Sequence, residues 1–387
     1  MGWAALSELM PYYPLYALLF LDTGLSTVQV SVLFAVWSVT GFVTEIPAGA
    51  LADRWSRRGV VVLAGVLQAA GFVVWTAAPA FGAFAVGFVL WGLGGALVSG
   101  ASEALVHDGL ADVGAESSFA RVYGWMTAAE LLVQIPTAVA ASALFALGGY
   151  RLVGWASVVV CLLAALLALR FPEPERVADG ETSLGATLRE GVREAVHTPV
   201  LRLTVLAVAL VGALDAVEEY FPVLAAAQGV PVTAVPFAVL AVALAGALGA
   251  ALGGRADRLP DRALPVLLGA AGLCLAATVL LPALAGLVAL CVFYGLYLAV
   301  LVVAEARLQD RIDSPHRATI TSVAGLGIEL GSLLVFAAWA LGGAVAVAVL
   351  VLAVVPVVRS GLRVSVSAAP AADTPTGECR RPTGSRD

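Results

Sequence analysis

The residues that could do chemistry in this 387-residue sequence are acids that lie inside long apolar stretches. A charged side chain in the middle of a bilayer is costly and usually marks the path of a solute or a proton. Glu130 shares a helix face with Gln134, and such polar faces are expected to point into a cavity rather than into lipid. This pattern selects Glu45, Glu130, Asp215, Glu218, Glu219 and Glu329. Glu45 fits equally well as a neutral, hydrogen-bonded packing residue.

The charge of these acids bears on the substrate. No arginine lies at matching depth in the apolar stretches, and the chain contains no lysine. An anionic substrate would need a basic partner in the cavity, because an unpaired charge there is expensive. We therefore expect a cation, a neutral solute, or a neutral solute carried with a proton. A carboxyl group buried without a cation is favoured in its neutral form, which suits it to take up and release protons.

The composition places the acids in a membrane protein. Hydrophobic residues make up 61% of the chain and charged residues 12%, whereas soluble proteins carry roughly 25% charged residues. A bilayer-spanning helix needs about 20 mainly apolar residues, and such blocks recur along nearly the whole chain. Spans are expected at 3–21, 28–51, 60–78, 81–106, 122–146, 150–169, 202–221, 231–253, 263–282, 284–305, 317–340 and 342–358.

The arginines predict the orientation of these twelve spans. With the N-terminus inside, every arginine except Arg151 falls on one side of the membrane. Basic residues concentrate in cytoplasmic loops of membrane proteins. We therefore expect a multi-pass protein of the cell membrane with both termini in the cytoplasm.

Two pairs of similar segments predict an internal repeat. Residues 49–54 (GALADR) resemble residues 253–258 (GGRADR), 204 positions later, and residues 103–108 (EALVHD) resemble residues 305–310 (EARLQD), 202 positions later. Each pair lies at matching span ends, which favours two homologous six-helix bundles with a cleft between them. The expected domains are the bundles 1–169 and 202–358, a cytoplasmic loop 170–201 and a disordered tail 359–387. The segment 184–196 within the loop has the spacing of an interfacial helix.

The segment from Gly49 through Asp53 to Arg58 resembles the signature loop between helices two and three of the major facilitator superfamily. The weaker copy at 253–262 lies where the second half of that superfamily carries its own. The resemblance implies two six-helix bundles, alternating access and an acid, Asp53, that faces the start of helix eleven, which Ser314 and Pro315 mark here. It also implies that Asp215 and Glu130 face each other across the two halves.

A conformational gate is the role that the resemblance implies for the signature. Gly49 would let a neighbouring helix pack closely, a helix N-terminus would stabilise Asp53, and Arg57 and Arg58 would pair with acids at the rim. The expected gate comprises Gly49, Asp53, Arg54, Arg57, Arg58, Glu103, Asp108, Asp257, Arg258 and Glu305. The alternatives are that the arginines only determine topology and that Glu103 and Glu305 act in transport itself.

These observations favour an all-α secondary transporter that moves a small neutral or cationic solute, coupled to protons, and efflux is one possible direction. The expected pathway comprises Glu130, Gln134, Asp215, Glu218 and Glu329. The expected partners are a small-molecule substrate, protons and the lipid bilayer, with a monomeric chain, no nucleic acid, no cofactor and no metal. The alternatives are a non-transporting sensor on the same fold and an intramembrane enzyme, for which the spans hold no histidine and no visible nucleophile–base pair.

Overall fold

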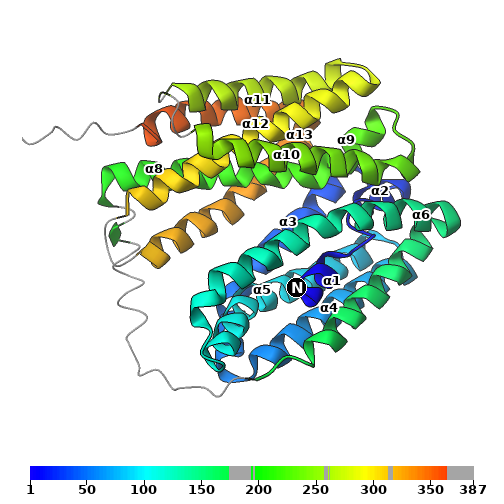
Figure 1. Cartoon of the computed structure of the whole chain (residues 1–387). Helices are drawn as coiled ribbons and strands as arrows, with labels where there is room; N and C mark the ends of the chain where they lie inside the picture. Colours follow the sequence, from blue (N-terminus) through cyan, green and yellow to red (C-terminus); the bar gives the residue numbers. More distant parts are fainter. Residues whose placement is uncertain (174–192, 195–196, 257–259, 261, 313–316, 364–387) are drawn as a thin grey trace, which may run out of the picture.

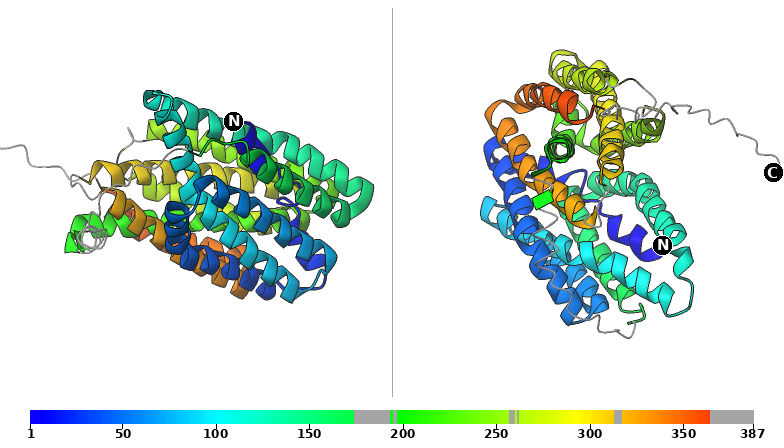
Figure 2. Two further views of the ribbon diagram at one scale, coloured as in Figure 1. Left: turned by 90° about the horizontal axis from the view of Figure 1, so that it is seen from below. Right: turned by 90° about the vertical axis from the view of Figure 1, so that its left-hand side faces the viewer.

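The computed structural model describes residues 1–173, 193–194, 197–256, 260, 262–312 and 317–363, without the side chains at 46, 50, 53, 54, 100, 255, 256 and 318. The predicted interfacial helix at 184–196 and the predicted tail fall almost entirely outside these residues. Within the described part the regular structure is helical throughout. The helices form two groups, which Figure 1 shows one above the other and Figure 2 shows from two further sides.

The first group of helices comes from the N-terminal half of the chain. It contains α1 (Gly2–Glu8), α2 (Tyr16–Asp22), α3 (Thr27–Arg54), α4 (Arg57–Ala77), α5 (Phe81–Ala111), η1 (Glu116–Ser118) and α6 (Phe119–Ala168). Serines begin two of the long helices, because the Ser26 and Ser56 hydroxyls accept hydrogen bonds from backbone N–H groups that have no partner within the helix. We call this group the N-terminal bundle.

The second group forms the C-terminal bundle. It contains α8 (Pro199–Ala213), η2 (Leu214–Tyr220), α9 (Phe221–Ala227), η3 (Val232–Ala234), α10 (Val235–Ala256), α11 (Ala263–Leu280), α12 (Ala283–Asp310) and α13 (Arg317–Gly361). The helix α8 begins with Pro199 in its first turn, where proline is well tolerated. The seventh span therefore begins before residue 202, where the sequence predicted its start. The last span, in α13, continues beyond residue 358, its predicted end.

The described helices account for twelve spans. Nine helical segments are long and apolar enough to cross a membrane. Two of these, in α6 and α13, each contain two spans that fold back at a glycine pair, and α1 with α2 supplies the remaining span. The two glycine turns match: Gly149 has φ +57° and Gly343 has φ +60°, a left-handed conformation that favours glycine. The same turn at the same place supports the predicted repeat.

The first span is not the continuous helix 3–21 that the sequence predicted. It consists of α1 and α2, separated by residues 9–15, which contain Pro11 and Pro14. Proline lacks the backbone N–H that a helix interior needs, and it disfavours helical conformation in the residue before it. The chain therefore leaves the helix in the middle of the bundle.

The seventh span is interrupted at the corresponding place. The predicted helix 202–221 is α8, followed by the 3-10 turn η2 and then by α9, which contains Pro222. The sequence at the first break is Tyr12-Tyr13-Pro14, and at the second it is Tyr220-Phe221-Pro222. Both bundles thus present a broken helix with two aromatic residues before a proline.

The two bundles meet along a shared aromatic core. In the N-terminal bundle the rings of Tyr16, Phe34 and Phe88 pack against one another. Across the interface Phe34 contacts Tyr220, with ring centroids 5.2 Å apart, and Phe336, with centroids 5.7 Å apart. The helix α3 packs on α13, α6 on α10, and α2 on α9, as Figure 1 shows near the labels α2 and α9.

Candidate functional site

The broken helices bring together tyrosines of one bundle and acids of the other. The Tyr13 hydroxyl in the first break donates to Glu218 Oε1 in η2, at 3.2 Å. The Tyr16 hydroxyl donates to Glu219 Oε2, and this second carboxylate is 4% exposed. Irregular backbone at membrane depth is tolerated where it is buried in protein or lines a cavity. The breaks in this protein meet both conditions.

Two further hydrogen bonds cross the same interface. The Ser31 and Tyr220 hydroxyls lie 2.8 Å apart, and the Ser38 hydroxyl donates to Glu329 Oε2 at 3.0 Å. Tyr16–Glu219 and Ser31–Tyr220 lie toward the end of the molecule that carries Arg151 and the two glycine turns, here called the Arg151 end, and Tyr13–Glu218 and Ser38–Glu329 lie nearer mid-depth. The opposite end, which carries Arg57, Arg311 and Arg317, is called the arginine-rich end. These four hydrogen bonds therefore join the bundles between mid-depth and the Arg151 end.

A cavity of about 560 Å³ lies between the bundles, next to the broken helices. Its polar walls come mainly from the N-terminal bundle and its apolar wall from α10 and α12 of the other. The side chains that line it are Glu8, Met10, Tyr13, Pro14, Gln68, Trp91, Leu131, Gln134, Thr137, Ala138, Glu218, Phe221, Pro236, Val239, Leu240, Ala243, Ala247, Ala250, Tyr294 and Leu298. This set contains two carboxylates and no basic residue. Its size is that of a small-molecule site.

The acids of the C-terminal bundle share a tyrosine. The Tyr294 hydroxyl lies 3.1 Å from Asp215 Oδ1 and 3.4 Å from Glu218 Oε2. Glu218 thus contacts Tyr294 on its own bundle and Tyr13 on the other. Asp215 shares Tyr294 but has no described contact with Glu130, although the family resemblance placed those two acids opposite each other.

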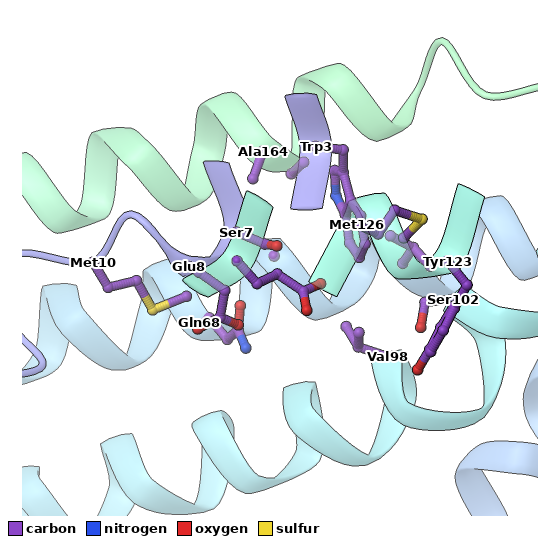
Figure 3. Close-up of a pocket in the computed structure, with 14 residues that line it drawn as sticks. Trp3, Ser7, Glu8, Met10, Gln68, Val98, Ser102, Tyr123, Met126 and Ala164 are labelled. Atoms are coloured by element: carbon purple, nitrogen blue, oxygen red, sulfur yellow. The ribbon is translucent and has the colours of Figure 1, made fainter. Parts of the chain in front are cut away.

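A second pocket, of about 120 Å³, lies within the N-terminal bundle and adjoins the central cavity. Glu8, Met10 and Gln68 line both spaces. In Figure 3 the side chains of Glu8 and Gln68 lie close together, between α1 and the neighbouring helices. Glu130 also lines this pocket, within electrostatic range of Glu8. The predicted pathway residues Glu130 and Gln134 are therefore both at cavity walls.

Glu8 is a site residue that sequence reasoning missed. It lies in the first apolar block, and its signal was the same one that selected the other deep acids. The block was treated as an uninterrupted span, so no acid in it was weighed. The prolines three and six positions later mark the break that places Glu8 beside the cavity.

The ion pair at the arginine-rich end lies inside the N-terminal bundle. Arg57 at the start of α4 pairs with Asp108 near the end of α5. Arg58 Nε lies 3.5 Å from Glu173 Oε2, and the Arg58 guanidinium also donates a hydrogen bond to the Phe171 carbonyl at 3.1 Å. These contacts hold the short connection between α3 and α4 against its own bundle.

Other predicted gate residues have different neighbours. Glu103 accepts a hydrogen bond from Tyr123 at 2.6 Å within the same bundle. Glu45, which was predicted as a deep acid and not as a gate residue, accepts one from Ser99 at 3.0 Å. Glu305 is exposed on α12. Asp257, Arg258, Ser314 and Pro315 lie outside the described residues, and the side chains of Asp53 and Arg54 are not described.

Gly49 has open space around it in this conformation, and its close packing with a neighbouring helix stays a prediction. A Cβ atom built on Gly49 would meet nothing within 4 Å. The described contacts of α3 with the other bundle lie near Phe34 and Ser38, between mid-depth and the Arg151 end. Gly49 is about three helical turns further along α3, where no described neighbour comes close.

Comparison with known proteins decides the family. The family description "Major Facilitator Superfamily" matches residues 1–336. The chain belongs to the major facilitator superfamily. A sequence search of curated proteins gave no match.

Solved transporters of this fold superimpose along most of the chain. A bacterial homologue of the human lysosomal transporter Spinster, inward-facing and unoccupied, shares 18% identity over 93% of this chain and 90% of its own, with a TM-score of 0.66. The nucleoside transporter NupG shares 12% identity over 92% of this chain and 94% of its own, with a TM-score of 0.71. A D-xylose–proton symporter shares 14% identity over 92% of this chain and 95% of its own, with a TM-score of 0.68.

Membership of the major facilitator superfamily settles the general activity. The chain is a multi-pass membrane transporter and not an enzyme. The superfamily fold has twelve helices in two bundles, as predicted from the sequence. The cavity between the bundles is therefore the candidate solute site.

Proposed function

We propose that this chain is a proton-coupled secondary active transporter that moves a small neutral or cationic solute across the cytoplasmic membrane by alternating access. The observation that carries the proposal is the central cavity, which both bundles line and which contains two carboxylates and no basic residue. An anion would enter that cavity without a partner, at a high desolvation cost. The similar structures of a nucleoside transporter and a sugar–proton symporter support a neutral solute as one option.

The orientation follows from the distribution of basic residues. We assign the arginine-rich end to the cytoplasm, because basic residues accumulate there in membrane proteins. Both termini then lie in the cytoplasm. The interface hydrogen bonds close the external half of the molecule, so the conformation described is inward-facing. We propose that the monomer is the transporting unit, since each chain carries both of the bundles that line the cavity.

Proton coupling is assigned to the acids beside the broken helices. Asp215 and Glu218 share Tyr294, and Glu218 reaches across the interface to Tyr13. Protonation of Glu218 would turn a charged acceptor into a weaker neutral one. A proton at this site therefore changes the strength of a bond that must break when the external half opens. Glu130 and Glu329, which also lie at the pocket wall and at the interface, complete the proposed proton pathway.

The gate is assigned to the loop after α3 and its copy in the second half. We propose that Asp53 and Arg54 make the gate contact, and that the Arg57–Asp108 pair and Arg58 hold their loop in position. Asp257 and Arg258, with Glu103 and Glu305 at the ends of α5 and α12, form the rest of the gate. Asp53→Asn should insert normally, lose most transport and favour the inward-facing state. A variant with normal transport would refute this role.

The test of the proposed function is solute flux in proteoliposomes with and without an imposed pH gradient. The candidate solutes are labelled amines, nucleosides and sugars. The expected result is accumulation of at least one solute only when the gradient is present. Asp215→Asn, Glu130→Gln and Glu329→Gln should lose accumulation while downhill exchange continues in part. Accumulation by all three variants would contradict proton coupling through these residues, and accumulation of an anion would contradict the charge argument.

A further inference from the structure

We propose that the central cavity binds a hydrophobic monocation, an amine or quaternary ammonium ion that carries an apolar group, and that Glu8 is its counter-charge. The proposal deepens the proposed function by naming a substrate class, and it rests on that function for transport. Binding itself is a separate property of the cavity. We infer binding from three features of the cavity: the different partners of its two carboxylates, its aromatic side chains and its apolar wall.

The two carboxylates of the cavity differ in their partners. Glu218 contacts the hydroxyls of Tyr13 and Tyr294, so its carboxyl oxygens already have hydrogen-bond partners. Among the described residues, no hydrogen bond or ion pair is found to the side-chain carboxylate of Glu8, which lines the cavity and is within electrostatic range of Glu130. A carboxylate without a partner, next to another acid, is the group that gains most from a cationic ligand.

Aromatic side chains line the same cavity as Glu8. The rings of Tyr13, Trp91, Phe221 and Tyr294 all line the cavity. Tyr13 and Trp91 lie with ring centroids 6.3 Å apart, and Phe221 and Tyr294 with centroids 4.9 Å apart. Aromatic faces attract ammonium groups through their quadrupoles, and more strongly when water is excluded. The walls therefore suit a cation with weakly hydrated substituents better than a strongly hydrated metal ion.

The wall of the cavity formed by α10 and α12 is apolar and favours a ligand that carries an apolar group. Val239, Leu240, Ala243 and Ala247 of α10 present only hydrocarbon to the cavity, together with Leu298 of α12. A solute with several hydroxyl groups, such as a sugar, would lose hydrogen bonds to water on this side. A cation with an aromatic or aliphatic body can place its charge near Glu8 and its body against α10.

The test is binding of three matched probes to the purified protein, measured by titration calorimetry. The probes share a phenoxy group: phenoxyethyl-trimethylammonium is cationic, 2-phenoxyethanol is neutral and phenoxyacetate is anionic. We expect the cation to bind roughly tenfold or more tightly than the neutral probe and the anion not to bind. Wild-type protein that binds the neutral probe as tightly as the cation overturns the proposal without any variant.

Variants of Glu8 then locate the charge. Glu8→Gln should lose roughly tenfold in affinity for the cation and little for 2-phenoxyethanol, while Glu8→Asp keeps the charge and retains most of the preference. Glu116→Gln, on the exposed turn η1, is the matched control for net charge and should bind like wild type. Equal losses in Glu8→Gln and Glu116→Gln would assign the preference to net charge and contradict the role of Glu8. Binding of the cation without pH-driven flux would reject proton-coupled transport and leave the binding site standing.

Discussion

The two ends of the interface between the bundles differ in the kind of contact they make. Between mid-depth and the Arg151 end, hydroxyl groups of one bundle bind carboxylates and a tyrosine of the other, in the pairs Tyr13–Glu218, Tyr16–Glu219, Ser31–Tyr220 and Ser38–Glu329. At the arginine-rich end the described ion pairs stay within one bundle. The difference identifies the contacts that would have to break for the bundles to separate toward the Arg151 end, and three of these four contacts involve a carboxylate.

The largest effect is expected from Glu218, which joins the cavity, the proton site and the interface. Glu218→Gln should reduce accumulation driven by a pH gradient to the level of passive exchange, because the side chain can no longer exchange a proton. Flux in proteoliposomes measures this, with the exposed Glu116→Gln as the control. Accumulation at the wild-type level in Glu218→Gln would show that proton coupling does not pass through the contacts toward the Arg151 end.

A smaller effect is expected from Tyr16, which donates to the buried Glu219. A hydrogen bond to a charged group contributes about 1.5–3 kcal/mol, whereas side-chain bonds inside membranes average about 0.6 kcal/mol. Tyr16→Phe removes this bond and should therefore increase the fraction of molecules that are open at the Arg151 end. The reporter is a cysteine in place of Leu18 of α2, which packs in one cluster with Ala225 of α9, and the readout is its labelling rate with an impermeant maleimide.

The control for that experiment lies in the same broken segment. Tyr12 is buried within the N-terminal bundle, with its backbone N–H bonded to Ser157 of α6. Tyr12→Phe also removes one hydroxyl but no bond between bundles, so the labelling rate should stay at the wild-type value. Equal rates in the Tyr12 and Tyr16 variants would contradict a specific role of the Tyr16–Glu219 bond.

The smallest effect is expected from Ser31, whose hydroxyl pairs with Tyr220 between neutral groups. Such a bond contributes about 0.5–1.5 kcal/mol. Ser31→Ala should raise the labelling rate of the cysteine at position 18 less than Tyr16→Phe does. A larger increase than in the Tyr16 variant would mean that the acids are not the main contacts at this end.

The sequence predicted the fold better than it predicted the site. Apolar blocks, the arginine distribution and the repeated motifs indicated twelve spans in two bundles, because each is a local or periodic property of the chain. The breaks near Pro14 and Pro222 were missed, although the prolines themselves were visible, because the apolar blocks were treated as continuous helices. Glu8 was missed with the first break.

The contacts that define the site could not be predicted in this way. Tyr13 and Glu218 are 205 positions apart, and only the packing of the two bundles brings them together. Close packing at Gly49 stays a prediction, because its expected neighbour depends on how near the bundles approach at the arginine-rich end. Pairings between bundles change with conformation, and a motif does not specify the conformation.

The most direct test of alternating access is a pair of distances measured by double electron–electron resonance in protein reconstituted without its native cysteines. One pair of spin labels, at Val28 and Leu281, reports on the Arg151 end, and the other, at Val113 and Asp310, reports on the arginine-rich end; all four positions are exposed. When pH or solute changes, we expect the distance at one end to lengthen while the other shortens. Distances that stay constant, or that change in the same direction at both ends, would contradict the account.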